Sequence, residues 1–234
     1  MTKERVYGRR PVHEALRGPR EVLELWATER AVASEPWLGD GPRVQVKPDR
    51  EIAEAAETRD HQGVLAWCEP YRYADAHELA KVDRPLLACL DQVTDPRNLG
   101  AVIRSAEGAG ATGVVVPAHG SALVTAAVCR ASAGAVEHLP VAVVPNLARY
   151  LNEIKRGDLW IYAASAEAEQ NLWTADLTGG LALVFGAEGK GVRPLVRRAC
   201  DAAISIPLAG NVESLNVSVA AALLLYEARR RRDG

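Results

Sequence analysis

The stretch that decides the fold is Leu181-Ala182-Leu183-Val184-Phe185-Gly186-Ala187-Glu188-Gly189-Lys190-Gly191. Its first five residues are apolar without interruption, which is typical of a strand buried on both faces of a parallel sheet. Three glycines in the next six residues let the backbone bend and approach a ligand closely, whereas a purely structural turn seldom needs all three. No Gly-Lys-Ser or Gly-Lys-Thr closes the loop, so it is not a Walker phosphate loop. The stretch predicts a covered strand that ends in a ligand-binding loop.

Five more apolar runs follow the same pattern from Pro85 onwards. Stretches long enough to form helices separate them, which implies parallel pairing of the strands. We therefore predict an α/β fold with a doubly wound parallel sheet. Ligands bind such sheets beyond the carboxyl ends of the strands, so the loops after these runs are candidate sites. The runs are residues 86–90, 114–116, 141–144, 159–163 and 203–206.

The first seventy residues have the pattern of a separate, small α/β unit. Apolar residues recur there either on one face of a helix or in short strand-like runs. These expected helices and strands are residues 11–16, 22–26, 43–47, 49–56 and 63–67. A polar stretch without periodicity follows and is expected to be a linker. The predicted organisation is a first domain over residues 1–70, a linker over 71–84 and a second domain over 85–234.

The composition is that of a folded protein with little net charge. Of the 234 residues, 48% are hydrophobic and 25% are charged, and 28 Lys and Arg against 30 Asp and Glu give a net charge of −2. An acidic balance limits nonspecific binding to nucleic-acid phosphates. Basic residues nevertheless gather within the first twenty residues and at residues 229–232. This placement predicts a few local basic patches and a modest salt dependence.

The cysteines and the apolar runs indicate the compartment. Cys68, Cys89, Cys129 and Cys200 stand far apart, so neither a metal site nor a disulfide framework is expected. The N-terminal residues lack the apolar segment of a signal peptide. No apolar run approaches the ~20 residues that a membrane-spanning helix needs. We therefore predict a cytoplasmic protein that binds neither a membrane nor a metal.

Residues 108–113 match the dinucleotide-binding pattern Gly-x-Gly-x-x-Gly. That pattern binds a dinucleotide when it follows a strand and opens a helix. Here the order is reversed, because a predicted helix over residues 99–106 precedes it and a predicted strand follows. The glycines are expected to end the helix, where a left-handed residue is needed. This order argues against a nucleotide-dependent oxidoreductase.

Residues 95–104 follow the first apolar run of the second domain and enter a helix. Asn98 is expected to be the N-cap of this helix, with its side-chain oxygen accepting a backbone N–H. Arg104 lies on the flank of the buried stripe. It either pairs with Glu107, three residues further on, as a solvated surface pair, or it faces the crevice at the strand ends. The sequence alone does not decide between these two interpretations.

Residues 206–218 lead from the last apolar run into a helix expected over residues 215–226. That helix carries no charge, so it is expected to be buried against the sheet or a second subunit. Ser214 is its expected N-cap, and Asn216 and Ser218 add polar groups in the first turns. An unpaired buried polar group costs ~1–3 kcal/mol. These side chains therefore need a ligand, an RNA phosphate or the Gly186 loop as a partner.

Three segments, taken in order, resemble the signature motifs of the SpoU (TrmH-like) RNA 2′-O-ribose methyltransferases, which belong to the SPOUT superfamily. They are Asn98 to Arg104, Gly186 to Gly191, and Ile206 to Leu208 together with Ser214 to Ser218. The front of the chain, at residues 6–16 and 61–64, resembles the ribosomal-protein-L30e-like substrate-binding domain of the family's ribosomal RNA members. The resemblance covers nearly the whole chain.

The resemblance implies S-adenosylmethionine as the methyl donor and RNA, not DNA, as the partner. It also implies a homodimer and a trefoil knot at the carboxyl end of the catalytic domain. The residues expected at the methyl donor are Ala164, Ser165, Gly186, Glu188, Gly189, Ile206, Leu208, Ser214, Leu215 and Asn216.

The family's pattern places the catalytic arginine at Arg104. We expect Arg104 to contact the ribose 2′-hydroxyl and the adjacent phosphate and to stabilise developing negative charge, whether or not it accepts the proton. The residues expected around it are Asn98, Glu188, Ser214 and Asn216. The residues expected to contact RNA are Arg9, Arg10, His61, Arg97 and Lys190.

The expected substrate is large-subunit (23S) ribosomal RNA, because the front domain accompanies the ribosomal RNA members of the family. The target favoured by the resemblance is the guanosine of the peptidyl-transferase loop. Methylation of another ribosomal RNA ribose, as in antibiotic-resistance relatives, or of a tRNA ribose stays open. A non-catalytic RNA-binding protein is the alternative from a different class, but it has no need of both Arg104 and the Gly186 loop.

Overall fold

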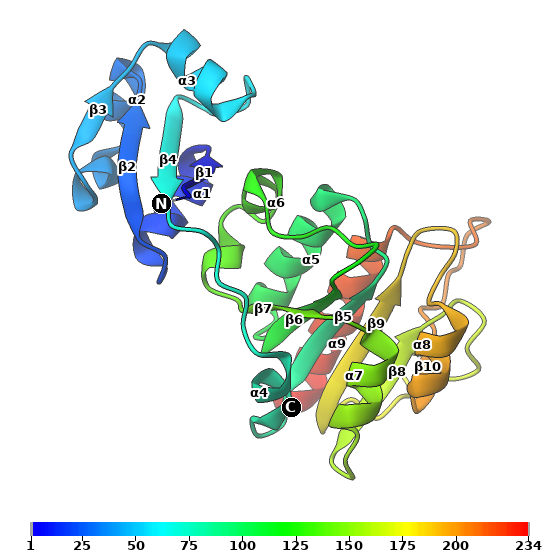
Figure 1. Cartoon of the computed structure of the whole chain (residues 1–234). Coiled ribbons are helices and arrows are strands. Elements are labelled where there is room, and N and C mark those ends of the chain that lie inside the picture. Colours follow the sequence, from blue (N-terminus) through cyan, green and yellow to red (C-terminus); the bar gives the residue numbers. More distant parts are fainter. Residues whose placement is uncertain (1, 234) are drawn as a thin grey trace. The chain divides into compact units, whose positions relative to one another are not determined.

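The computed structural model describes residues 2–233, and their contacts form two compact units. Unit 1 comprises Met1–Arg72 together with Val124–His138. Unit 2 comprises Tyr73–Leu123 together with Leu139–Gly234. Figure 1 shows a smaller sheet in unit 1 and a larger one in unit 2. No helix within the described residues is long and apolar enough to cross a membrane.

A six-stranded parallel sheet forms the centre of unit 2, which confirms the predicted α/β fold. The strands lie in the order β10-β8-β9-β5-β6-β7. Because all of them are parallel, their carboxyl ends lie at the same edge of the sheet. Each predicted apolar run forms one strand. The strands are β5 (Leu86–Asp91), β6 (Gly113–Pro117), β7 (Val141–Val144), β8 (Leu159–Ala164), β9 (Gly180–Gly186) and β10 (Ala202–Ile204).

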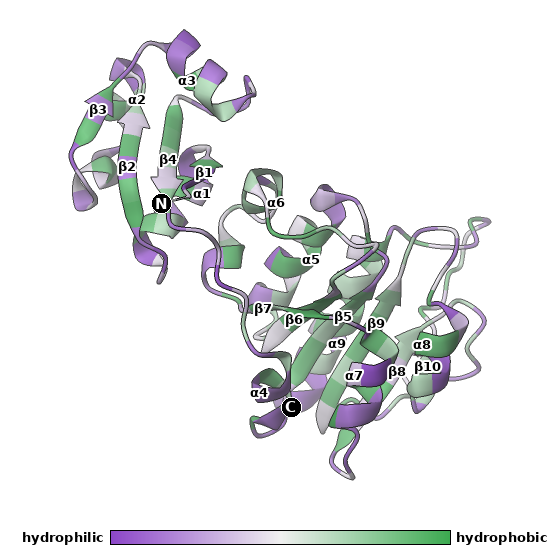
Figure 2. Ribbon diagram, viewed as in Figure 1, coloured by the Kyte–Doolittle hydropathy of each residue, from purple (hydrophilic) through white to green (hydrophobic). Residues whose placement is uncertain are grey.

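Helices cover both faces of this sheet (Figure 1). On one face α4, α7 and α8 share a buried core with alternate strand residues such as Leu87 and Ala163. On the other face α5 packs against α9, which lies against β9 and β5. Figure 2 shows the central strands to be largely hydrophobic, as burial on both faces requires. The helices are α4 (Ala76–Lys81), α5 (Pro96–Gly108), α7 (Leu147–Ile154), α8 (Pro194–Ala199) and α9 (Val217–Asp233).

Helix α5 begins earlier than predicted, and its cap is Asp95. The Asp95 side chain accepts the backbone N–H of Arg97 at 2.8 Å, and Pro96 occupies the first turn. A proline fits there because its missing N–H has no partner in that turn. The prediction that Asn98 is the N-cap was therefore wrong. Asn98 lies inside the first turn, and its side chain is free for contacts with other segments.

The glycines of residues 108–113 end α5, as predicted. The helix stops at Gly108, and Gly110 adopts a left-handed φ of +71°. The Gly110 N–H donates to the carbonyl of Glu107 at 2.9 Å, and β6 begins at Gly113. The segment connects a helix to a strand and does not have the strand-to-helix geometry of a dinucleotide site.

Helix α9 begins two residues later than predicted, and Asn216, not Ser214, caps it. Asn216 Oδ1 accepts the Ser218 N–H at 2.9 Å, and the Asn216 carbonyl accepts the Ala220 N–H. The sheet covers one side of the helix. On another side of the helix, three apolar residues at helical spacing are exposed to solvent. They are Val219, Leu223 and Tyr226.

Unit 1 contains a four-stranded mixed sheet in the order β1-β4-β2-β3. Strand β1 was not predicted, because Glu4 and Arg5 interrupt its apolar pattern. Its antiparallel pairing with β4, where Val6 faces Ala66, makes it a strand. The elements are β1 (Glu4–Tyr7), α1 (Arg9–Arg17), β2 (Val22–Ala27), α2 (Glu29–Ser34), the 3₁₀ helix η1 (Pro36–Asp40), β3 (Val44–Val46), α3 (Asp49–Ala56) and β4 (Val64–Cys68).

The segment Val124–His138 packs into unit 1, although it lies within the second domain taken from the sequence. It carries α6 (Ala126–Ala131) and the 3₁₀ helix η2 (Ala135–Glu137). Arg20 and Glu137 form an ion pair with side chains only 6% and 1% exposed. Burial disfavours the charge of Arg20, but Glu137 outweighs it and raises the pKa of the guanidinium above its ordinary value. This buried pair ties the segment to the rest of unit 1.

We expect Arg20→Met to lower the free energy of unfolding by about 3–5 kcal/mol, since it leaves the Glu137 carboxylate buried without its cation. Urea unfolding measures the loss. Arg17→Met is the matched control, because Arg17 is exposed and its pair with Glu14 lies on the surface. We expect the double variant Arg20→Met, Glu137→Leu to recover part of the stability. An unfolding free energy equal to that of Arg17→Met contradicts the prediction.

Candidate active site

Three loops meet at the carboxyl edge of the sheet in unit 2. The side chains of Asn98, Glu188 and Asn216 connect them. Asn98 Nδ2 donates to Glu188 Oε1 at 3.2 Å, and Asn216 Nδ2 donates to Asn98 Oδ1 at 3.1 Å. Asn216 Nδ2 also donates to Glu188 Oε1. Asn98 lies in the first turn of α5, Glu188 in the loop after β9 and Asn216 at the start of α9, so each predicted motif supplies one corner of a polar triangle.

The loop after β9 folds back over the end of its own strand. Its Gly191 N–H donates to the Ala187 carbonyl at 2.8 Å. A Cβ atom at Gly186 would lie 2.0 Å from the Gly191 carbonyl carbon and 2.2 Å from the Val192 nitrogen. Real Cβ atoms do not approach backbone so closely, so only glycine fits there. The loop therefore keeps its backbone, with Glu188 on it, close to the strand end.

The remaining residues expected at the methyl donor lie in loops at the same edge. Ala164 ends β8, and the Ser165 N–H donates to the Ile204 carbonyl at 3.0 Å, which joins the β8 loop to β10. The loop after β10 carries the other candidates: Ile206 and Leu215 are half-buried, and Leu208 and Ser214 are exposed. The edge thus offers apolar side chains and bent backbone around the polar triangle.

Arg104 lies on α5 with its side chain exposed. It follows Asn98 by six residues, which is about 9 Å along the helix axis. Across residues 2–233 no ion pair joins Arg104 to Glu107, so the surface-pair interpretation gains no support. Within the same residues no hydrogen bond or ion pair joins Arg104 to the triangle. Two of the residues expected to contact RNA are exposed: Arg97 in the first turn of α5 and Lys190 in the loop after β9.

The two front segments that carry the resemblance meet in unit 1. The Arg9 N–H donates to Gln62 Oε1 at 3.1 Å, and Arg9 Nη1 pairs with Glu35 at 2.7 Å. Arg10 is exposed. His61 is only 2% exposed, and its Nδ1 accepts the Gly63 N–H at 3.0 Å. The expectation that His61 contacts RNA is corrected, because its ring is buried and holds the turn before β4.

Two family models match the chain. Residues 85–226 match the SpoU rRNA Methylase family, and residues 5–74 match the model described as RNA 2′-O ribose methyltransferase substrate binding. The first match includes all three corners of the polar triangle. The chain belongs to the SpoU rRNA methylase family.

Relatives and solved structures agree with this SpoU assignment along almost the whole chain. The 23S rRNA (guanosine-2′-O-)-methyltransferase RlmB of Shewanella oneidensis is 40% identical, over 97% of this chain and 97% of that protein. The crystal structure of the SpoU methyltransferase AviRb from Streptomyces viridochromogenes superposes with a TM-score of 0.84 and 26% identity, covering 99% of this chain and 90% of that one. The AviRb structure in complex with AdoMet gives a TM-score of 0.80 at 25% identity, over 99% and 91% of the two chains.

Asp91 is a buried residue at the site of this SpoU chain that sequence analysis missed. It ends β5, is 0% exposed and pairs with Arg193 at 2.7 Å. The sequence contains one signal for this residue: Asp91 is a charged residue that directly follows the apolar run 86–90. Buried carboxylates are rare without a charged partner, so a role for Asp91 could have been suspected.

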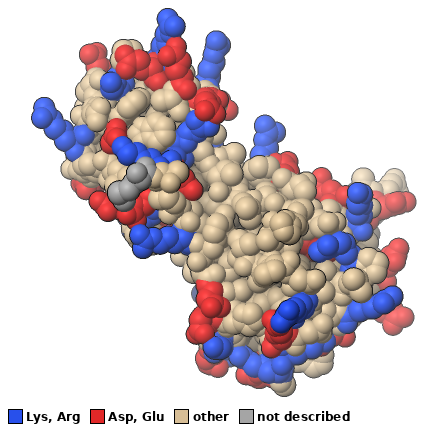
Figure 3. Space-filling model, viewed as in Figure 1, with Lys and Arg blue, Asp and Glu red and all other residues tan. Residues whose placement is uncertain are grey.

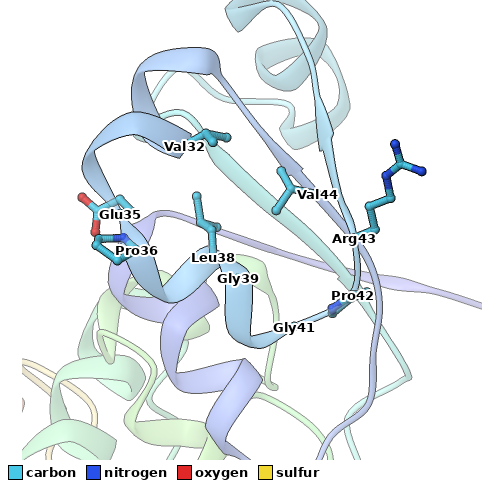
Figure 4. A pocket seen from close by; sticks show the side chains of 9 residues that line it. All are labelled: Val32, Glu35, Pro36, Leu38, Gly39, Gly41, Pro42, Arg43 and Val44. Carbon is cyan, nitrogen blue, oxygen red and sulfur yellow. The ribbon is translucent and has the colours of Figure 1, made fainter.

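The surface charge and the cavity in unit 1 add no further site residue. Figure 3 shows basic and acidic side chains interspersed on the face drawn, as a net charge of −2 suggests. A cavity of about 280 Å³ lies among α2, η1 and β3 (Figure 4). Its Glu35 already pairs with Arg9, and Arg43 points away from the other lining side chains in Figure 4. None of the predicted site residues lines it.

Proposed function

We propose that this protein methylates a ribose 2′-hydroxyl of 23S ribosomal RNA with S-adenosylmethionine as the methyl donor, as an RNA (ribose-2′-O-)-methyltransferase. The observation that carries the proposal is the triangle of Asn98, Glu188 and Asn216, which unites three loops distant in sequence at one sheet edge. The name and full-length similarity of RlmB support the ribosomal RNA substrate. The guanosine of the peptidyl-transferase loop is the target that we favour.

The residues at the sheet edge fit S-adenosylmethionine. The bent backbone of the loop after Gly186 and the half-buried Ile206 and Leu215 suit a flat adenosine, whose ring edges need backbone donors and acceptors. We assign the neighbouring positions Ala164, Ser165, Gly189, Leu208 and Ser214 to the same ligand. The AdoMet complex of AviRb supports this assignment. The donor supplies a methyl group on a sulfonium, which a ribose oxygen can attack.

Arg104 is the residue that we assign to the reacting hydroxyl. We assign it charge stabilisation at the 2′-oxygen and the neighbouring phosphate, whether or not it also accepts the hydroxyl proton. Asn98, Glu188, Ser214 and Asn216 would orient the ribose beside it. Holding two reactants in line lowers a barrier by ~7–11 kcal/mol in well-aligned systems.

The domain roles and the assembly are also part of the proposal. Residues 1–70 form the L30e-like RNA-binding domain, 71–84 the linker and 85–234 the catalytic domain with a trefoil knot. Arg9 and Arg10 of unit 1, and Arg97 and Lys190 of unit 2, contact the RNA. The exposed apolar side of α9, formed by Val219, Leu223 and Tyr226, supports a homodimer that covers it. Ribosomal RNA as the substrate places the enzyme in the cytoplasm.

Transfer of a labelled methyl group to total RNA from a strain lacking this protein tests the function. We expect label in 23S ribosomal RNA, with one new ribose that resists alkaline cleavage, in the peptidyl-transferase loop. RNA from the strain that contains the protein is the control and should accept no label at that position. Label at another ribosomal RNA ribose or in tRNA identifies the alternative substrates. Absence of transfer together with RNA binding favours the non-catalytic alternative.

A further inference from the structure

An ion pair between the buried Asp91 carboxylate and Arg193 closes the loop that carries Glu188. The carboxylate of Asp91, at the end of β5, accepts the backbone N–H of Arg193 at 2.8 Å and its Nε at 2.9 Å, while Nη2 lies 2.7 Å away. Asp91 is fully buried, whereas the Arg193 side chain is 44% exposed. A buried carboxylate is tolerated when charge and hydrogen bonds satisfy it, and here Arg193 supplies both.

Asp91 lies at both ends of the loop. At the first end, Asp91 is the register partner of Gly186 in the pairing of β5 with β9. At the second end, the same Asp91 holds Arg193, the residue before α8. Only six residues, 187–192, lie between these points, and most of them are exposed. One carboxylate therefore lies at both ends of the loop that folds back over Gly186.

We propose that Asp91 is a positioning residue, which acts through Arg193 to hold the Gly186 loop and Glu188 in the shape that binds the methyl donor. The identity of that ligand rests on the proposed function. Without the pair, the loop would also adopt open conformations that do not bind the ligand. The apparent affinity is then the affinity of the closed loop multiplied by the fraction of molecules in which the loop is closed. A saturating ligand restores the closed shape, so the maximal rate changes little.

The test compares the variants Arg193→Gln, Asp91→Asn and the double variant with the wild-type protein. Arg198→Gln is the matched control, because Arg198 is an exposed residue of α8 outside the site. Hydrogen exchange on the ligand-free protein follows the Gly191 amide, which donates to the Ala187 carbonyl in the closed loop. Calorimetry gives the Kd for S-adenosylmethionine, and steady-state assays separate KM from kcat.

We expect Arg193→Gln and Asp91→Asn to speed exchange at Gly191 and to raise Kd and KM for S-adenosylmethionine at least about fivefold, with kcat within about twofold of wild type. We also expect the double variant to resemble the single ones, since both single changes break the same pair. Arg193→Lys should recover part of the affinity through its charge.

Two results overturn the proposal separately from the proposed function. Unchanged exchange at Gly191 in Arg193→Gln shows that the pair does not hold the loop, whatever the ligand is. A loss of kcat with unchanged KM shows only general destabilisation of the enzyme. Failure of the wild-type protein to bind S-adenosylmethionine overturns the proposed function, and the exchange measurement still decides whether the pair closes the loop.

Discussion

Arg104→Ala is expected to lower kcat for methyl transfer at least about 100-fold, the scale of loss when one group that stabilises transition-state charge is removed. The side chain is exposed on α5, so its removal leaves the fold intact. In the described part of the chain no hydrogen bond or ion pair joins it to the loop at Gly186, so the affinity for S-adenosylmethionine should stay within about twofold of wild type. Single-turnover transfer to ribosomal RNA and calorimetry measure the two quantities.

The control for this prediction is Arg149→Ala, which removes an exposed arginine from α7, on the other face of the sheet. We expect its rate within about twofold of wild type. Near-normal turnover of Arg104→Ala would remove Arg104 from the catalytic assignment. Loss of S-adenosylmethionine binding in that variant would instead assign Arg104 to the donor site.

Gly186→Ala is expected to lower kcat/KM for methyl transfer about 100-fold, because displacement of a reacting group by 1 Å can cost that much. The new Cβ would meet backbone atoms of Gly191 and Val192 at 2.0–2.2 Å, and no side-chain rotation relieves that overlap. The loop must move away from the strand end and take Glu188 with it. In contrast to Arg104→Ala, this variant should also lose affinity for S-adenosylmethionine, which calorimetry measures.

Gly157→Ala is the matched control, since a Cβ atom at Gly157 meets no atom within 4 Å and its φ is not in the left-handed region. We expect its kinetics and its melting temperature to stay close to those of the wild-type enzyme. Wild-type affinity and rate in Gly186→Ala would mean that the fold-back of the loop is not required for binding.

Local residue patterns were sufficient to predict the six strands of unit 2. Uninterrupted apolar runs such as residues 181–185 can be satisfied only by burial on both faces, so their strand identity hardly depends on the rest of the chain. Patterns at element ends were less reliable. Asn98 and Asp95 are both good caps, and the choice of Asp95 depended on Pro96 taking the first turn.

Unit 1 was harder to predict because its signals are short. Strand β1 has four residues, two of them charged, and it is stabilised by pairing with β4 about sixty residues away. The burial of His61 likewise follows from packing around the turn before β4. An isolated histidine in a polar loop has no local feature that separates a buried ring from an exposed one.

The sequence by itself determined the parallel sheet, the glycine loop at its edge and the three motifs that define the family, because each depends on residues adjacent in the chain. Only the tertiary structure decided which side chains meet. Asn98 and Asn216 are 118 residues apart, and Asp91 lies 102 residues from Arg193. Such contacts follow from the order in which strands enter the sheet, and spacing along the chain does not encode that order.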